Sequence, residues 1–436
     1  MKNLIVGGGL LGLCTAHALV SRGEEVMLLE RQKDAGDETS FANGGMLTPS
    51  MADPWNSPGV GWHVLRSIGD DSAPMLVRPQ AFPSLISWGI EFLRHSVRSR
   101  YERATRASYA LATYSLDETR KLRESLGLEY AVGTRGTMKV FRDQKTMRAP
   151  LALARMLEQQ GMSYRVLDRA QVLEVEPQLE PIADELVGGL HFTGDESGDA
   201  HLFCRALAED VGTRGANLRF GVEVKRLIAN DGKVSGVETK EGGFTAERVI
   251  VAAGSYSMPL LKAVGLHLPV RPAKGYSITI DGSELDCDLP TIPVVDQGLH
   301  AAVTPLGQRI RVAGTAEFTG FDTQIRLARI QNLLALLEGL YPEIAVRMNR
   351  ERIDPWAGLR PMSADGLPFI GSAHLQGLYL NTGHGALGWS QAMGSGKLLA
   401  DLICGESPEI DSAPYRADRM RPPKAPRESK TAKPMR

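Results

Sequence analysis

A chain of 436 residues exceeds the roughly 150 residues of a common domain, so we expect two domains rather than one. Its composition, with 43% hydrophobic and 23% charged residues, is that of a globular protein and excludes a disordered chain, a collagen-like repeat and a coiled coil. The formal net charge of −1 argues against nucleic acid as the main partner, because a surface that follows phosphates needs a large excess of lysine and arginine.

The first 30 residues predict a strand, a helix and a second strand, at 3–6, 10–20 and 25–30. The helical pattern stops at Arg22-Gly23, and the whole is typical of a βαβ unit. The apolar stretch 4–20 also imitates a secretory signal, but the spacing of its glycines favours the βαβ interpretation. No other stretch approaches the roughly 18 uninterrupted apolar residues of a membrane span.

Two unusual segments follow. Residues 35–75 are rich in glycine, proline, serine and asparagine and too long for a simple connection, so we expect a functional loop or lid there. From 83 to 128 the pattern becomes helical and polar, with Trp88, Phe92 and His95 at helical spacing, and predicts an inserted helical cap.

A second block of helices and strands begins near Pro150. Its expected helices are 151–160 and 202–214, and its expected strands are 163–167, 217–220, 223–230, 233–239 and 243–253. The chain is again rich in strand patterns from 269 to about 316 and then predicts a helix over 323–341. It continues with a strand at 378–381, a glycine-rich loop at 383–388 and a helix at 390–404.

The cysteines and histidines give no sign of a metal site. The four cysteines are Cys14, Cys204, Cys287 and Cys404, far apart and without a C-x-x-C pair. The nine histidines include no H-E-x-x-H motif. We therefore expect a reduced, cytoplasmic protein without a structural metal.

A dinucleotide-binding motif stands at the start of the chain. Gly7, Gly9 and Gly12 form the pattern G-x-G-x-x-G between the first strand and the first helix, and Glu30 ends the second strand. The first glycine permits a tight turn, the second lets backbone N–H groups approach a pyrophosphate, and the third lets the helix pack close to the strand. Glu30 would accept hydrogen bonds from ribose hydroxyls.

NAD and FAD share this motif, and features elsewhere favour FAD. The motif stands at the start of a long chain, and residues 39–45 supply hydroxyl, amide and free backbone groups where a ribityl chain would pass. The late strand 249–254 and the loop Gly383-His384-Gly385 ahead of a helix would meet the ring system. By contrast, Gly394-Ser395-Gly396-Lys397 is not an ATP-binding loop, because the spacing lacks a glycine at 391 and a hydroxyl at 398.

With these features the sequence resembles the flavoproteins of the D-amino acid oxidase and glycine oxidase superfamily, and within it the small, catalytic subunits of bacterial D-amino acid dehydrogenases. The matching stretches follow the family's order from residue 3 to about 404 and leave only the tail beyond Pro414 outside. They are 6–12, 38–45, 194–199, 254–257, 274–277, 358–362 and 380–389.

The resemblance implies oxidative deamination of D-amino acids to 2-oxo acids and ammonia, by hydride transfer from Cα to N5 of an FAD, with electrons passed to a quinone or another carrier. The FAD is expected to be noncovalent, because Pro361-Met362 stand where related sarcosine oxidases have a cysteine. The expected cofactor-binding residues are Gly7, Gly9, Leu10, Leu11, Gly12, Glu30, Arg31, Ser40, Asn43, Gly44, Gly45, Val224, Ala253, Gly254, Gly383, Gly385, Leu387 and Gly388.

Three residues are candidates for the catalytic site. Arg360 stands in the motif where this superfamily keeps its carboxylate-binding arginine, although an arginine reaching to solvent from a turn is an alternative. Tyr276 could close the site over the substrate or be a half-buried strand tyrosine. His384 could bind the flavin or the amine, or only follow the backbone between two glycines.

The expected fold class is α/β, with a Rossmann-like FAD-binding domain interleaved with an α+β substrate domain made of a β-sheet and a helical cap. We assign 1–55, 148–265 and 355–412 to the FAD-binding domain and 56–147 and 266–354 to the substrate domain. Residues 413–436 form a basic tail that we expect to be disordered; from 416 it holds eight lysines and arginines against two acids.

The expected location is cytoplasmic. The tail could anchor the protein peripherally on the inner face of the membrane, or be a solvated extension. Two alternatives for the activity remain open: a D-hydroxyproline or other secondary-amine dehydrogenase or oxidase of the same superfamily, and a non-catalytic dinucleotide-binding protein.

Overall fold

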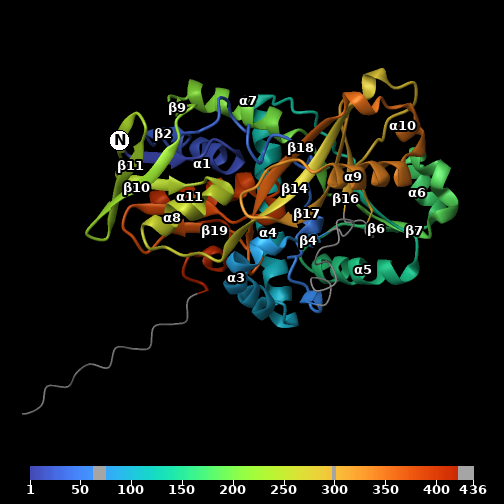
Figure 1. Ribbon diagram of the computed structural model, residues 1–436, viewed down its shortest axis with the longest axis horizontal. Helices are drawn as coiled ribbons and strands as arrows, with labels where there is room; N and C mark the ends of the chain where they lie inside the picture. The colour runs from blue at the N-terminus through green and yellow to red at the C-terminus, as the bar shows by residue number, and fades with distance from the viewer. Residues whose placement is uncertain (62–74, 297–300, 421–436) are drawn as a thin grey trace, which may run out of the picture.

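A computed structural model describes residues 1–61, 75–296 and 301–420 of the chain. Two large sheets lie side by side in it, one at the left and one at the right of Figure 1. The first has six strands, in the spatial order β19 (Phe369–Ser372), β20 (Leu378–Thr382), β13 (Arg248–Val251), β1 (Asn3–Val6), β2 (Val26–Leu29) and β9 (Asn217–Arg219). All neighbours are parallel except β19 and β20.

The central strands of this sheet are short apolar runs because both of their faces are covered. On one face Ile5, Leu28 and Ile250 pack against helices, and on the other Leu4 and Val249 pack against a small antiparallel sheet and a short helix. The helices of the first face are α1 (Leu10–Val20), α4 (Arg98–Leu126), α7 (Ala200–Thr213) and α11 (Ala392–Cys404). The second face is covered by β10 (Val224–Asn230), β11 (Lys233–Thr239), β12 (Gly242–Thr245) and α8 (Ser257–Ala263).

The second sheet is mainly antiparallel and has nine strands. Its spatial order is β18 (Asp354–Ser363), β14 (Val270–Asp281), β17 (Arg309–Phe318), β16 (Ala301–Leu306), β15 (Val294–Asp296), β5 (Thr137–Phe141), β7 (Gly188–Phe192) and β6 (Arg165–Leu167), with β4 (Met75–Val77) also paired to β17. One face carries an apolar core against α9 (Leu327–Leu340) and α10 (Pro342–Arg347). The other face turns toward the first sheet and forms part of a cavity.

Smaller elements connect the two sheets and cover their ends. They are β3 (Met46–Leu47), which pairs with β8 (Glu196–Ser197), and the helices α3 (Phe82–His95), α5 (Gln144–Glu158) and α6 (Arg169–Val175). Short 3-10 turns are η1 (Pro49–Met51), η2 (Pro79–Ala81), η3 (Pro177–Glu185), η4 (Gly254–Tyr256), η5 (Gly282–Glu284), η6 (Arg350–Arg352), η7 (Gly385–Leu387) and η8 (Ala413–Tyr415).

The structure confirms the α/β fold class, but its sheets divide the chain differently from the expected domain limits. β6, β7 and β18 fall in ranges assigned to the FAD-binding domain, and all three pair within the nine-stranded sheet. Conversely, α4 is expected in the substrate cap, but it packs against α1 and α11, which cover the six-stranded sheet. Local periodicity predicts an element but not its partner, which explains these differences.

The beginning of the C-terminal tail, which we expect to be disordered, is ordered in the structure. Residues 413–420 are packed rather than disordered: Tyr415 is 1% exposed, and its hydroxyl donates to the Ala107 carbonyl at 2.8 Å. Arg419 binds the Asp365 carboxylate and lies over the Phe369 ring. One buried aromatic ring and one ion pair therefore order residues 413–420, although the composition of this stretch predicts disorder. The rest of the tail, 421–436, and residues 62–74 of the expected lid lie outside the described residues.

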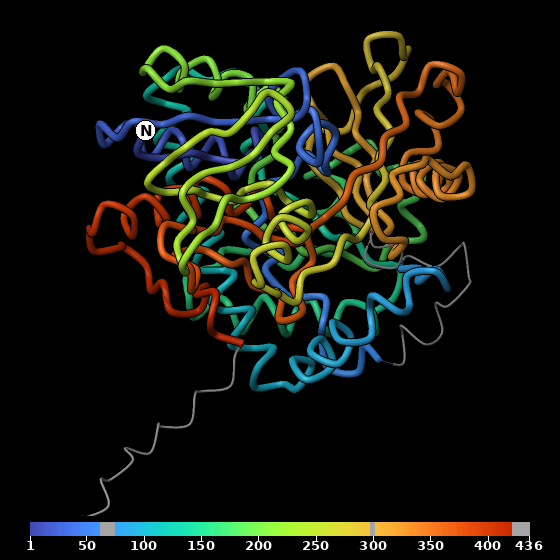
Figure 2. The backbone as a smooth tube through the Cα atoms, turned by 60° about the vertical axis from the view of Figure 1, so that its left-hand side comes forward, coloured from blue at the N-terminus to red at the C-terminus, as the bar shows by residue number. Residues whose placement is uncertain are grey.

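The N-terminal and C-terminal segments lie side by side, at the left of Figure 2, where α1 packs directly on α11. Within the described ranges, no helix is both long enough and apolar enough to span a bilayer.

Candidate active site

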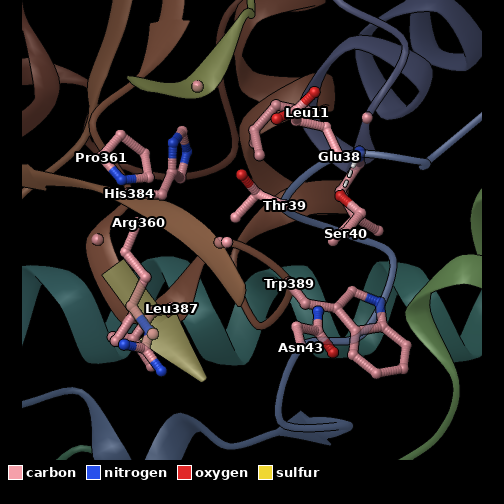
Figure 3. A pocket seen from close by; sticks show the side chains of 18 of the residues that line it. Leu11, Glu38, Thr39, Ser40, Asn43, Arg360, Pro361, His384, Leu387 and Trp389 are labelled. Atoms are coloured by element: carbon pink, nitrogen blue, oxygen red, sulfur yellow. Dashed lines mark hydrogen bonds between the residues drawn. The ribbon is translucent and has the colours of Figure 1, made fainter. Parts of the chain in front are cut away.

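A cavity of about 1110 Å³ runs between the two sheets. Figure 3 shows that its wall combines residues from the N-terminal segment, such as Ser40 and Asn43, with Arg360 and His384 from the C-terminal part of the chain. Most of the expected cofactor-binding residues line it: Gly7, Gly9, Leu10, Leu11, Glu30, Arg31, Ser40, Asn43, Gly44, Val224, Ala253, Gly254, Gly385, Leu387 and Gly388.

The first crossover opens one end of α1 to this cavity. Gly7 has φ +113°, a backbone conformation that favours glycine, and a Cβ there would lie 2.7 Å from the Ala252 carbonyl oxygen. The Leu10 N–H donates to the Ser40 hydroxyl at 3.3 Å, and Leu11 faces the cavity in the first turn of the helix. The N–H groups and positive dipole end of an eleven-residue helix thus point at a place suited to phosphate.

Glu30 and Arg31 line the part of the cavity beyond this helix end. The Glu30 carboxylate accepts hydrogen bonds from the backbone N–H groups of Gly8 at 2.5 Å and Gln32 at 2.8 Å. Arg31 lies over the Tyr256 ring, 3.6 Å from its centroid. Glu30 therefore fixes the turn around the glycines as well as facing the cavity.

The segment after Ser40 is held against the second sheet by hydrogen bonds from three side chains that the sequence analysis did not identify. Three consecutive carbonyl groups accept hydrogen bonds: Ala42 from the Ser277 hydroxyl (2.6 Å), Asn43 from the Arg311 guanidinium (2.8 Å) and Gly44 from the Thr304 hydroxyl (2.9 Å). Burial lowers the pKa of Arg311 to about 10, which leaves it cationic at neutral pH. Only the pattern Lys274-Gly275-Tyr276-Ser277 hinted at one of these donors; strands β16 and β17 carry no local signal for the other two.

Gly12, Gly45 and Gly383 are expected cofactor-binding residues that are not part of the cavity wall. Each lies beside it for a packing reason. A Cβ on Gly12 would lie 1.9 Å from the Gly7 carbonyl oxygen, so only glycine lets α1 pack this close to the turn. Gly45 has φ +68° and Gly383 has φ +85°, and both sit against neighbouring side chains.

The polar atoms of the cavity fit a large polar ligand. Three buried atoms on lining residues, His384 Nδ1, Trp389 Nε1 and Thr315 Oγ1, have no hydrogen-bond partner within the part of the chain that the structure describes. Buried donors and acceptors are normally paired. Together with the glycine turn and the helix end, they suit a dinucleotide with a polar ring system, as FAD is.

Arg360 reaches into the cavity from β18. Its guanidinium lies across Gly275, where a Cβ would be 2.2 Å from Nη1, and Nη1 donates to the Thr315 carbonyl at 3.0 Å. Thr315 has φ +54°, and it sits next to the irregular pairing between β14 and β17. Burial lowers the pKa of Arg360 to about 10, so the guanidinium remains charged at pH 7. No acidic partner faces it among residues 1–61, 75–296 and 301–420.

Tyr276 borders the cavity on β14, but its ring packs in the apolar core that the second sheet shares with α9 and α10, on the face opposite to that of Ser277. It is 1% exposed, and its hydroxyl donates to Glu317 Oε2 at 2.5 Å. Burial, followed by the hydrogen bond to Glu317 and the charge of that carboxylate, raises the pKa of the phenol. Glu317 is in turn bound by Arg78 at 2.6 Å and lies 3.4 Å from the Lys274 ammonium. The ring is therefore held in the core of the second sheet, as expected of a buried strand tyrosine.

His384 is a neutral imidazole in this site. Its Nε2 lies 2.9 Å from the Ser395 hydroxyl, and Nδ1 is the unpartnered atom described above. Burial lowers the pKa of His384 to about 3. It can therefore donate or accept one hydrogen bond toward the cavity, but it does not supply a proton as imidazolium near pH 7.

The family to which these features point is found by comparison with known proteins. The family model described as FAD dependent oxidoreductase matches residues 3–402. The chain belongs to this family. It is thus an FAD-dependent oxidoreductase, and the alternative of a non-catalytic dinucleotide-binding protein is set aside.

Curated relatives match nearly the whole chain. The D-amino acid dehydrogenase of Granulibacter bethesdensis is 40% identical over 413 residues, which cover 95% of this chain and 98% of the relative. The D-amino acid dehydrogenase of Methylobacterium sp. (strain 4-46) is 40% identical over 422 residues, covering 97% and 99%.

Solved structures agree on the fold of this FAD-dependent oxidoreductase. The glycine oxidase from Geobacillus kaustophilus has a TM-score of 0.74 at 24% identity, covering 96% of this chain and 98% of that one. The L-proline dehydrogenase from P. horikoshii has a TM-score of 0.76 at 18% identity, covering 96% and 97%.

Proposed function

We propose that this enzyme oxidises D-amino acids to 2-oxo acids and ammonia. One observation carries the proposal: the guanidinium of Arg360 is buried in the cavity and, among the described residues, is bound only by a backbone carbonyl. Its remaining N–H groups are left for an anionic ligand. A carboxylate is the natural partner for such a fork of donors. Relatives at 40% identity over almost the full chain are named D-amino acid dehydrogenase.

Different residues of the cavity have different roles in the reaction. When bound, FAD supplies the two-electron oxidation of the Cα–N bond. Arg360 holds the substrate carboxylate, and its own position is fixed by the Thr315 carbonyl. Neutral His384 offers one hydrogen bond without placing a positive charge near the amine. Water then converts the imino acid to the 2-oxo acid and ammonia.

The test is reduction of the purified flavoprotein without oxygen. We expect D-alanine to bleach the flavin absorbance and L-alanine to leave it unchanged, with pyruvate and ammonia formed in equal amounts. Trans-4-hydroxy-D-proline and N-methylglycine belong in the same panel, because reduction by these alone would replace D-amino acids with secondary amines as substrates. A flavin that stays oxidised with every compound would contradict the proposal.

We also propose that the electrons leave for a quinone or another carrier rather than mainly for oxygen, at the surface of a membrane. A surface stripe supports this. Apolar side chains between 40% and 63% exposed follow α3 at helical spacing and continue to the residue before α4: Phe82, Ile86, Ile90, Leu93 and Val97. Five arginines at 94, 98, 100, 103 and 106 stand against two glutamates in the same stretch. An apolar face beside basic residues is typical of helices that lie on anionic lipid.

The acceptor is tested by reoxidation. Protein reduced with D-alanine is mixed with either air-saturated buffer or a short-chain ubiquinone in the absence of oxygen, and the return of flavin absorbance is followed. We expect the quinone to reoxidise the protein at least about tenfold faster than oxygen does. Faster return in air would make the enzyme an oxidase.

A further inference from the structure

Lys139 is a further cation of the cavity, besides Arg31, Lys225 and Arg360, and no role has been proposed for it so far. It lies on β5, is only 6% exposed and lines the cavity wall. Its ammonium is 5.6 Å from the centroid of the Phe192 ring. Within the described ranges no carboxylate is close enough to form an ion pair with it.

Asp195 is a buried acid on which the charge of Lys139 acts, but its hydrogen bonds come from other groups. Its carboxylate accepts hydrogen bonds from the hydroxyls of Ser50 (2.5 Å) and Thr137 (2.6 Å). Burial raises the pKa of Asp195 to about 6, and the charge of Lys139 acts in the opposite direction. Asp53 also lines the cavity but is not paired with Lys139. A buried ammonium without a direct counter-ion is costly, which points to a ligand that supplies one.

Lys139 and Arg360 stand at opposite ends of a floor made of small residues. Arg360 is on β18 and Lys139 on β5, with β14, β17, β16 and β15 between them. The floor is formed by Gly275, Gly314, Ala302 and Val295, one from each of these strands, and all four line the cavity. Five strand spacings amount to roughly 24 Å between the two backbones. The Arg360 side chain crosses over β14, and the long lysine side chain shortens the distance from the other end.

We propose that Lys139 binds a second carboxylate, carried on the side chain of the substrate, so that the enzyme favours acidic D-amino acids such as D-glutamate. This subsite rests on the proposed function, because Arg360 must hold the α-carboxylate. The two strands stand roughly 24 Å apart before their side chains reach inward, which favours a carboxylate several bonds from Cα, so D-glutamate is preferred over D-aspartate. Small floor residues leave room for the connecting methylene groups.

The test compares D-glutamate with D-glutamine, which has the same shape without the charge. We expect the ratio of their kcat/KM values to favour D-glutamate in the unchanged protein. Lys139→Met should lower this ratio by about tenfold or more, because a hydrogen bond to a charged group is lost. Lys139→Arg should restore most of it. Lys145→Met, which removes an exposed lysine from α5, is the matched control and should leave the ratio unchanged.

A second measurement does not depend on turnover. Glutarate carries both carboxylates without an amine, and its binding is followed through the flavin absorbance; Lys139→Met should weaken it more than it weakens butanoate. Oxidation of D-alanine together with an unaltered D-glutamate to D-glutamine ratio and unaltered glutarate binding would overturn the subsite alone. Failure of the protein to oxidise any D-amino acid would overturn the proposed function as well.

Discussion

The guanidinium of Arg360 is the group whose loss we expect to affect the reaction most. Arg360→Ala removes both the charge and the donors that face the cavity, so kcat/KM for D-alanine should fall by about 10²-fold or more, mainly through KM. Arg360→Lys keeps a charge without the planar fork and should recover part of the loss. Steady-state kinetics with an artificial electron acceptor measures both.

A matched control for this prediction is Arg155→Ala, which removes an exposed arginine from α5. Arg155→Ala should leave kcat and KM for D-alanine unchanged. Unchanged kinetics in Arg360→Ala itself would remove Arg360 from the site.

His384 makes a prediction about pH and stability. Its pKa is about 3 in the folded protein and near 6.5 when unfolded, so between these values the unfolded chain binds one more proton. This lowers the free energy of unfolding as pH falls through 6.5. From pH 7 to pH 5 the loss due to His384 is about 2 kcal/mol. Urea unfolding at both pH values should show a loss smaller by this amount in His384→Gln, and equal losses would contradict the buried neutral imidazole.

At the scale of elements, two helices meet through glycine rather than through larger side chains. α11 crosses α1 at Gly396, where a Cβ would lie 2.6 Å from the Cys14 backbone. Gly396→Ala must push the helices apart, and we expect it to lower the free energy of unfolding by about 1–3 kcal/mol. A Cβ on Gly212 of α7 would lie 4.0 Å from the Leu218 side chain, an ordinary contact, so Gly212→Ala should gain about 0.5–1 kcal/mol from helix propensity. Urea unfolding of both variants tests the contrast.

The same glycines show how far the sequence can lead. The spacing of residues 394–397 was enough to exclude an ATP site. No pattern within α11 could show that Gly396 contacts Cys14, which lies far away in the sequence. The glycine turn at 7–12 was predictable because its chemistry is local and its spacing is fixed by a tight turn. Ser277, Thr304 and Arg311 were not, because their role arises only when strands of the second sheet meet the loop of the first half.

Over the whole molecule, the exposed apolar stripe on α3 was not predicted: the sequence pattern marked the other side of this helix, with Trp88 and Phe92. Trp88 and Phe92 of this helix are buried, while the opposite side, with Ile86 and Ile90, is exposed. α3 lies at the bottom of Figure 1, far from α10. The membrane surface that we propose is therefore confined to one side of the molecule.

Replacing Ile86 and Ile90 together by glutamate should weaken binding to phosphatidylglycerol vesicles by at least about tenfold, because two apolar contacts are lost and two negative charges are added. Cosedimentation with vesicles measures this, and phosphatidylcholine vesicles should bind weakly from the start. Val346→Glu on α10 changes an 84% exposed valine on another side and should have no effect. Equal binding by all three proteins would rule out α3 as the membrane surface.

The position of β1 in the middle of the first sheet has a consequence for biosynthesis. Its partners β2 and β13 are followed, much later in the chain, by β20, and the glycine loop at 383–388 comes later still. Residues up to 388 must therefore have left the ribosome before the nucleotide cleft has all its walls. The coenzyme is captured after translation, by a chain that has already brought its two ends together.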